Sequence, residues 1–206
     1  FNSQNSLIAD QLNGSPNNTI FASTSQTLIV PNPGNVNQYY IFTVSDVDIP
    51  NTIHNPLSYT IIDMSLNAGL GDTLPGTLNT FVPNSPITTE HVSAIPHCNG
   101  TDYWIIVHGA APPYLDKLLS YRLTQFGLDT PVVSNSFPVV QLSDTDVDEK
   151  DWAGQIDVAP NSRRVAITDL GTFTRTGGGG CHLYDFDRQT GKFTQVVTFP
   201  DGDGRY

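Results

Sequence analysis

Basic side chains are scarce in this chain of 206 residues, which has 9 Lys and Arg against 20 Asp and Glu and a formal net charge of −11. Recognition of nucleic acids or of anionic membrane surfaces needs clustered Lys and Arg, so the sequence argues against both as partners. No run approaches the ~18 apolar residues of a membrane helix, and we expect no membrane insertion. Two cysteines are too few to indicate a redox compartment.

Charged residues make up 14% of the chain, well below the ~25% of a typical soluble domain. What the sequence does contain is Thr, Val, Tyr, Phe and Ile, which recur in short runs between breaks rich in Gly and Pro. This composition is typical of an all-β protein.

The sequence repeats itself. An apolar run ending near a proline, a polar turn and a second β-like run occur three times, in "TLIVPNPGNVNQYYIFTV" (27–44), "VSAIPHCNGTDYWIIV" (92–107) and "IDVAPNSRRVAIT" (156–168). A third run follows in each unit, as "LSYTIID" (57–63), "LSYRLTQ" (119–125) and "HLYDFDR" (182–188), and a fourth as "LNTFVP", "PVVSNSFPVV" and "FTQVVTF". Pro31, Pro96 and Pro160 are 65 and 64 residues apart, and Tyr59, Tyr121 and Tyr184 are 62 and 63 apart.

Three units of four strands at a nearly constant period predict four-stranded antiparallel blades of a β-propeller. We expect blades at 27–90, 91–153 and 154–206, with 1–26 as the tail of a preceding blade. Three blades cannot close a ring, which needs about four, so the remainder of a larger polypeptide is expected on both sides.

Within the second unit, His97–Gly100 is predicted to be a turn, because Asn-Gly tolerates positive φ, and 102–107 a strand. The segment 114–123 is ambiguous. Leu115, Leu118 and Leu119 have helical spacing, whereas Leu119, Tyr121 and Leu123 alternate as in a strand. Its sequence Leu-Ser-Tyr at 119–121 repeats that of residues 57–59, and this match favours the strand.

Four stretches, "VNQYYIFTV", "SYTIIDMSLNAGLGD", "HCNGTDYWIIVH" and "LYDFDRQTGKFT", resemble the N-terminal propeller region of large exported proteins of the Bacteroidota. In that family PKD-like repeats and a gliding-motility-associated C-terminal sorting domain commonly follow the propeller. The resemblance covers roughly residues 25–206. It implies export by the type IX system, residence at the cell surface or outside the cell, and no catalytic residue.

The acidic stretch "SDTDVDEKDW" (143–152) is the sharpest local signal for a ligand. Asp144, Asp146 and Asp148 alternate and Asp151 follows, which offers calcium several carboxylates on a short loop. An EF-hand loop would need Gly and Glu where Glu149 and Gln155 stand, so the match is partial. The alternative is a solvated acidic loop.

Other catalytic patterns are weaker still. The five histidines lack zinc-ligand spacing, "TRTGGGGC" (174–181) lacks the Lys-Ser/Thr of a phosphate-binding loop, and there is no G-x-S-x-G. A carboxylate pair such as Asp63 with Asp185 would serve glycoside hydrolysis only if the fold brought the two together.

The expected function is therefore a non-catalytic extracellular or cell-surface propeller that serves binding, adhesion or scaffolding. The alternative is a propeller enzyme acting on carbohydrate or lactone, but the predicted inner strands (27–31, 92–96, 156–160) carry only Asp157 as a carboxylate. A protein or carbohydrate ligand is expected on the face that bears the long connections 45–56, 109–116, 143–153 and 169–180. Cys98 and Cys181 are predicted at opposite ends of their blades and hence without a disulfide between them.

Overall fold

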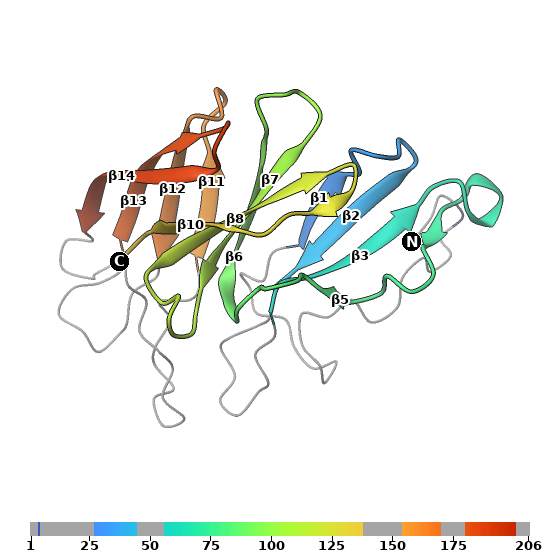
Figure 1. The fold of residues 1–206 in the computed structure, drawn as a ribbon, viewed down its shortest axis with the longest axis horizontal. Helices are drawn as coiled ribbons and strands as arrows, with labels where there is room; N and C mark the ends of the chain where they lie inside the picture. The colour runs from blue at the N-terminus through green and yellow to red at the C-terminus, as the bar shows by residue number, and fades with distance from the viewer. Residues whose placement is uncertain (1–3, 5–26, 45–55, 138–153, 170–179, 201–206) are drawn as a thin grey trace.

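The computed structural model describes residues 4, 27–44, 56–137, 154–169 and 180–200, which form three antiparallel β-sheets in chain order (Figure 1). The prediction of an all-β chain with three antiparallel sheets is confirmed. The one helical element in the described part is the single 3-10 turn η1 (Asn67–Gly69). No helix among the described residues is long and apolar enough to cross a membrane.

Each sheet is built from strands that follow one another along the chain. The first sheet contains β1 (Thr27–Pro31), β2 (Gln38–Thr43), β3 (Ser58–Asp63), β4 (Asp72–Thr73) and β5 (Thr80–Phe81). The second contains β6 (Thr88–Pro96), β7 (Tyr103–Gly109), β8 (Lys117–Thr124), β9 (Gly127–Leu128) and β10 (Val132–Asn135). The third contains β11 (Gly154–Val158), β12 (Arg164–Asp169), β13 (Gly180–Asp187) and β14 (Lys192–Pro200).

Two local predictions are decided by these bounds. The ambiguous segment 114–123 lies largely in β8, so the strand interpretation is confirmed and the helix is wrong. Residues 98–101 form the turn between β6 and β7, as the Asn-Gly pair predicts. Strand β6 begins at Thr88, three residues before the expected start of the unit at 91.

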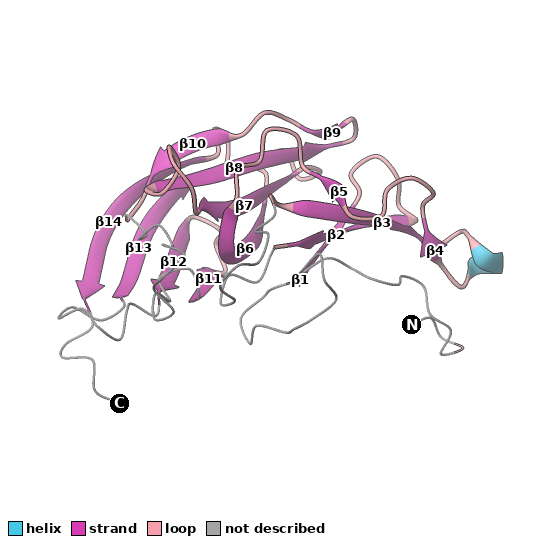
Figure 2. Ribbon diagram, turned by 90° about the horizontal axis from the view of Figure 1, so that it is seen from below, coloured by secondary structure: helices cyan, strands magenta, loops and turns pink. Residues whose placement is uncertain are grey.

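The middle sheet is buried on both faces, and β7 shows how. Its side chains alternate, so that Trp104 and Ile106 join the core shared with the third sheet while Ile105 and Val107 join the core shared with the first. All four are at most 4% exposed. Fully burying side chains of this size stabilises a fold by about 1.5–3 kcal/mol each. The two cores hold the three sheets face to face, as the view from below shows (Figure 2).

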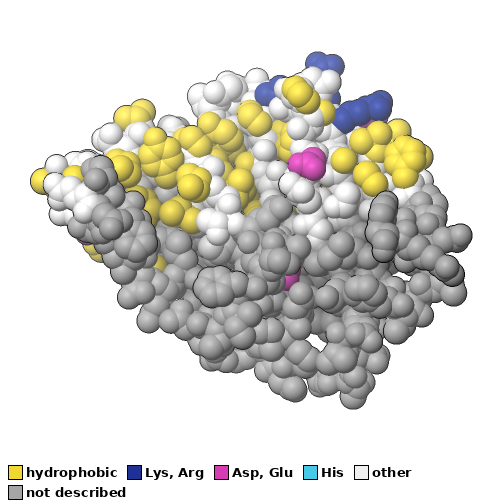
Figure 3. Space-filling view, turned by 180° about the vertical axis from the view of Figure 1, so that it is seen from behind, with side chains coloured by type: hydrophobic (Ala, Val, Ile, Leu, Met, Phe, Trp, Pro, Cys, Tyr) yellow, Lys and Arg dark blue, Asp and Glu magenta, His cyan; other side chains and the backbone are white. Residues whose placement is uncertain are grey.

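The first strands of the three sheets lie next to one another. Strand β6 contacts β1 on one side and β11 on the other, and the last strands β10 and β14 also meet. The two outer sheets keep apolar side chains on the faces turned away from the middle sheet, where Ile29 is 64% and Phe199 56% exposed. In the described part of the side opposite to that of Figure 1, hydrophobic side chains lie exposed among polar ones (Figure 3).

A polar latch joins the second and third sheets at their turn end. The indole Nε1 of Trp104 donates a hydrogen bond to the carbonyl of Arg188 at 2.8 Å. Arg188 donates in return from Nε to the carbonyl of Pro96 at 2.8 Å and from Nη2 to that of His97 at 3.2 Å. Gly191, with φ of 73°, lies so close to the indole that a β-carbon would come within 2.6 Å of it. The turn after β13 is thereby fixed to the turn after β6.

The repeated tyrosines are not all equivalent. Tyr121 pairs with Ile105 and faces the first sheet, and Tyr184 pairs with Val165 and faces the second, so both point to the preceding sheet. Tyr59 pairs with Phe42 and points to the following sheet. The cause is the register of the third strand in each sheet. Tyr40 and Trp104 both face the following sheet, but Tyr59 pairs two residues after Tyr40 and Tyr121 one residue after Trp104. A shift of one residue moves a side chain to the opposite face.

Candidate functional site

A cavity of about 440 Å³ opens at the turn end of the first and second sheets. It is lined by the β1–β2 turn, the β6–β7 turn, strand β8 and the turns that flank β9, through Pro33, Asn99, Thr101, Asp102, Arg122, Thr124, Gln125, Phe126 and Asp129. Its volume is in the range of ordinary small-molecule sites, about 300–1,000 Å³. The cavity therefore has the size to hold a small ligand.

One wall is the rigid turn Asn99–Asp102. The Asn99 side-chain oxygen accepts hydrogen bonds from the backbone N–H groups of Thr101 at 3.1 Å and Asp102 at 3.0 Å. The Asn99 N–H itself donates to Nδ1 of His97 at 3.0 Å, and Gly100 adopts φ of 80°, which favours glycine. Because every bend of this turn is held by a hydrogen bond or by glycine, the polar side chains on it are preorganised.

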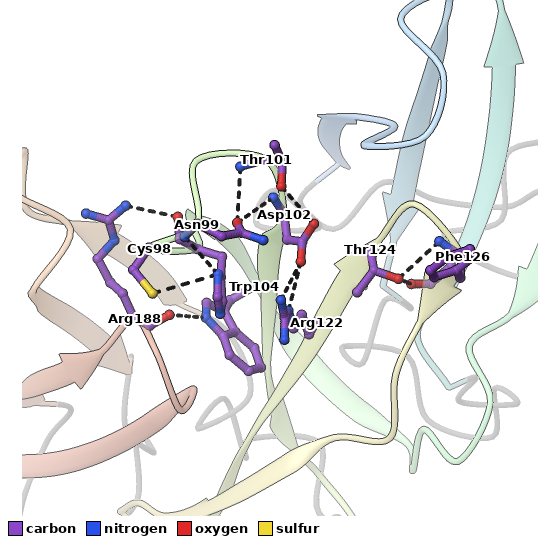
Figure 4. A network of polar contacts seen from close by, with 11 residues as sticks. Cys98, Asn99, Thr101, Asp102, Trp104, Arg122, Thr124, Phe126 and Arg188 are labelled. Carbon is purple, nitrogen blue, oxygen red and sulfur yellow. Dashed lines mark hydrogen bonds and ion pairs between the residues drawn. The ribbon is translucent and has the colours of Figure 1, made fainter.

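The floor of the cavity is an ion pair. Arg122 donates from Nε at 2.9 Å and from Nη2 at 2.7 Å to the same oxygen of Asp102, and Figure 4 shows both side chains turned toward each other. The Asp102 side chain is 10% exposed and that of Arg122 34%. The remaining guanidinium N–H groups of Arg122 therefore lie where a ligand can reach them.

The electrostatics of this pair disfavour proton transfer. Burial pushes the pKa of Asp102 upward, but the hydrogen bonds that it receives, foremost those from Arg122, outweigh burial and hold the pKa below its usual 3.8. Asp102 is consequently a carboxylate at neutral pH and has no proton to donate to a leaving group. The pair is suited to orienting polar groups of a ligand.

The opposite wall is the tight hairpin between β8 and β9. The Thr124 hydroxyl accepts from the Phe126 N–H at 3.1 Å and donates to the Gly127 carbonyl at 3.1 Å, while Gly127 supplies φ of 106° (Figure 4). These contacts fix Phe126 at the hairpin tip, where its ring is 90% exposed. Gly34 of the neighbouring turn comes so close that a β-carbon there would lie 2.8 Å from the Gln125 carbonyl.

The cavity and the latch occupy corresponding places in successive sheet pairs. Gln125 and Arg188 each stand four residues after a tyrosine that faces the preceding sheet, at the start of the turn that follows. In the second pair of sheets, Arg188 reaches across and closes the junction. In the first pair the shorter Gln125 stands there, where its backbone packs against Gly34 and it lines the cavity.

This site lies at the other end of the sheets from the long connections on which a ligand was expected. The turns after β1, β6 and β8 share one end, whereas Gly109 at the end of β7 and Lys117 at the start of β8 mark the opposite end. Most of those connections lie outside the described residues. Sequence reasoning treated the NGTD turn as structural and did not use the QFG turn. The signal in the sequence that could have indicated this site is the aromatic residue Phe126 at the tip of a two-residue hairpin.

The proposed calcium loop, with Asp144, Asp146, Asp148 and Asp151, lies outside the described residues, as does most of the glycine run 174–181. Among the residues that the structure describes, no group of three or more His, Cys, Asp or Glu side chains is placed to hold a metal ion. Calcium binding at 144–151 therefore stays a prediction.

If that loop binds calcium, millimolar calcium is expected to raise the melting temperature, because a ligand that binds only the folded state stabilises it. Asp146→Ala should abolish the rise, and Asp72→Ala, at an exposed aspartate outside the loop, should keep it. Thermal unfolding followed by circular dichroism, with and without calcium, measures both. An unchanged melting temperature of the parent protein would support the solvated acidic loop.

The structure does not bring the other candidate carboxylates together. Asp63 is in the first sheet and accepts hydrogen bonds from Gln38 and Ser65, whereas Asp185 is in the third sheet and pairs with Arg164 at 3.0 Å. The middle sheet separates the two, so they do not form a hydrolytic pair. Asp157 in β11 is exposed and points away from the core between the second and third sheets.

Both cysteines are free thiols, with Cys98 exposed in the turn after β6 and Cys181 partly buried in β13. The chain neighbour of Cys98, His97, is bonded to Arg188 at the far end of β13. Arg188 is seven residue steps from Cys181 along the strand, a span of roughly 23 Å, whereas a disulfide needs Cα atoms within about 7 Å. The register thus keeps the two thiols apart.

Sequence reasoning missed a buried polar cluster at the other end of the second and third sheets. A bulge in β6 between Thr88 and Val92 turns Glu90 and His91 into the interior, each 0% exposed. Nε2 of His91 donates to the Thr168 carbonyl of β12 at 2.8 Å, and its Nδ1 contacts the Thr89 hydroxyl at 2.7 Å. The predicted inner strand began at 92 and left these residues out.

Phe137 lies between two further histidines of this cluster. Its ring stacks on His108 at 4.8 Å and on His182 at 4.0 Å between centroids. His108 is fully buried, with Nδ1 2.8 Å from the Gly109 carbonyl and Nε2 3.2 Å from that of Phe137. Because His91 and His108 are fully buried and Phe137 and His182 are only 7% exposed, the cluster contributes to the packing of the sheets.

No protein-family model, curated protein or solved structure matches this chain. The geometry of the cavity and the arrangement of the sheets are therefore the features that point to a function.

Proposed function

We propose that the three sheets are consecutive blades of a β-propeller-type region that serves binding and not catalysis. The observation that carries the architecture is the packing of the sheets face to face with their first strands β1, β6 and β11 side by side. In a propeller these would be the inner strands. The apolar outer faces of the first and third sheets also fit blades that pack against further blades.

The binding role is supported by the cavity at the turn end. Its one buried carboxylate, Asp102, is held ionised by Arg122, and its walls are preorganised turns with polar side chains. The carboxylate of Glu90 is on an inner strand but is fully buried, and Asp157 points away from the core. The second candidate function, a propeller enzyme acting on carbohydrate or lactone, would need an accessible acid and base that converge on one cavity.

The exported location is supported by the resemblance of four sequence stretches to the propeller regions of type IX-secreted Bacteroidota proteins. A surplus of acidic over basic side chains fits a protein that meets neutral or basic partners. We therefore place the chain at the cell surface or outside the cell, as an adhesive or scaffolding part of a larger protein.

The experiment that separates binding from catalysis is a turnover assay on chromogenic glycosides and on lactones with the purified chain. We expect no product above the buffer rate, because Asp102 has no proton to give. The matched variant is Asp102→Asn, which keeps the shape of the side chain and removes its charge. Product formation that Asp102→Asn reduces would identify an enzyme and contradict the binding role.

A further inference from the structure

We infer that the cavity at the turn end is a binding subsite for a neutral saccharide, with Phe126 as the stacking platform. This inference rests on the proposed binding function and goes further by naming the ligand class and the residues. It is carried by the shape of the cavity, by the exposure of Phe126 and by the kinds of polar group around it.

The exposed ring is the first argument. Phe126 is 90% exposed, yet the Thr124 hydroxyl and the positive φ of Gly127 hold its backbone in one position. An aromatic side chain has only two χ angles, so it loses little conformational entropy when a ligand covers it. The negative face of such a ring attracts the C–H groups on the apolar face of a pyranose.

The polar groups are the second argument. Arg122 and the Asn99 amide present N–H donors, while Asp129 and the Gln125 amide oxygen present acceptors, and all four line the cavity. Planar side chains with two donors or acceptors match neighbouring hydroxyl groups on a sugar ring. Asn99 is fixed in place by the turn hydrogen bonds that its oxygen accepts and by the side-chain hydrogen bond that its amide donates to Asp102. The amide has two N–H groups, so one is left for a ligand.

Charge disfavours an anionic ligand. Asp102 neutralises Arg122, Asp129 leaves the cavity with a surplus of negative charge, and the chain carries a net charge of −11. An anionic sugar would be repelled, so uronic acids and sulfated glycans are disfavoured. A cavity of about 440 Å³ gives room for a short segment of a neutral glycan.

The test is a titration of the isotopically labelled chain, followed by backbone amide NMR shifts. The probes are cellotriose, maltotriose and mannotriose as neutral saccharides, trigalacturonic acid as the anionic one and trilysine as a basic peptide. We expect at least one neutral trisaccharide to shift the amides of 99–102 and 124–126 at millimolar concentration. Trigalacturonic acid is expected to leave them unmoved, and trilysine, which has no ring face to stack on Phe126, is expected to move the amides of 124–126 less than the saccharide does.

Substitutions identify the platform. Phe126→Ala is expected to weaken the saccharide by about tenfold, the loss of one stacking contact. The matched control Phe81→Ala removes a 50% exposed ring outside the cavity and should leave the affinity unchanged. Both side chains are solvent-exposed, so both variants should fold.

Three results would overturn the inference. These are no shift with any neutral trisaccharide, shifts that Phe126→Ala does not weaken, and shifts of the same amides by trigalacturonic acid or trilysine alone. None of these results involves product formation. The turnover assay therefore tests the proposed binding role independently of the saccharide titration.

Discussion

Trp104→Ala is expected to lower the free energy of unfolding by about 3–5 kcal/mol, the usual cost of emptying the place of a large buried aromatic residue. Trp104 is 4% exposed, packs edge-on against Phe186 at 6.3 Å and lies against the backbone of Gly191. Its removal also leaves the Arg188 carbonyl without the indole N–H. The core and the latch between the second and third sheets are weakened together.

Urea unfolding followed by far-ultraviolet circular dichroism measures this effect without depending on indole fluorescence. The matched control is Phe126→Ala, which removes an aromatic ring that is 90% exposed and should change stability by less than about 0.5 kcal/mol. Equal losses in the two variants would show that Trp104 does not hold the sheets together.

Acidification from pH 6.5 to 4 is expected to cost about 3 kcal/mol of stability through His108 alone. Burial first, and then the charge of His91, lower the pKa of His108 from 6.5 to about 4. In the unfolded chain the side chain titrates normally and takes up a proton below pH 6.5, whereas the folded state resists that proton until about pH 4. Stability is therefore complete above pH 6.5 and is lost as the pH falls through this window.

Geometry explains why the folded state resists the proton. The stacked ring of Phe137 covers His108, and both ring nitrogens face backbone carbonyls instead of carboxylates. A neutral imidazole donates to one of these carbonyls, and a charged one would donate to both but would be buried without a counter-ion in direct contact with its ring nitrogens. Desolvation outweighs the second hydrogen bond.

Urea unfolding at a series of pH values tests this prediction, with His108→Gln as the comparison. The variant should show a flatter pH dependence between 6.5 and 4, because glutamine does not titrate. Aspartates with lowered pKa, such as Asp102, start from an unfolded pKa of 3.8 and act mainly below this window. The same slope in the variant and in the parent would contradict the assignment to His108.

Much of the local structure was predictable because it depends on neighbours in the chain. The Asn-Gly pair at residues 99–100 predicted the turn, since it tolerates positive φ, and Gly100 has φ of 80°. Alternation in 119–123 predicted a strand against the competing helical spacing, and β8 is that strand. The proline period predicted three sheets, since each unit repeats the same order of strands and turns.

Of the candidate site, the sequence predicted little. The cavity joins Pro33, Asn99, Arg122 and Phe126, which come from two turns, a strand and a hairpin tip. Gln125 lines this cavity at the position where, between the second and third sheets, Arg188 bonds to the neighbouring turn. The two positions can be compared only once the packing of the sheets is known. Sequence reasoning looked for ligands on long loops at the opposite end.

The sequence by itself determined the strands, the turns and the number of sheets, because hydrogen bonding and φ preferences act over a few residues. Only the tertiary structure decided which way side chains point and what they meet. Tyr59 lies in the same Leu-Ser-Tyr sequence as Tyr121 yet faces the opposite way, because the register of β3 on β2 differs by one residue from that of β8 on β7. The bulge that buries Glu90 and His91, and the bond from Trp104 to Arg188 across 84 residues of chain, arise from packing between sheets, which no local pattern encodes.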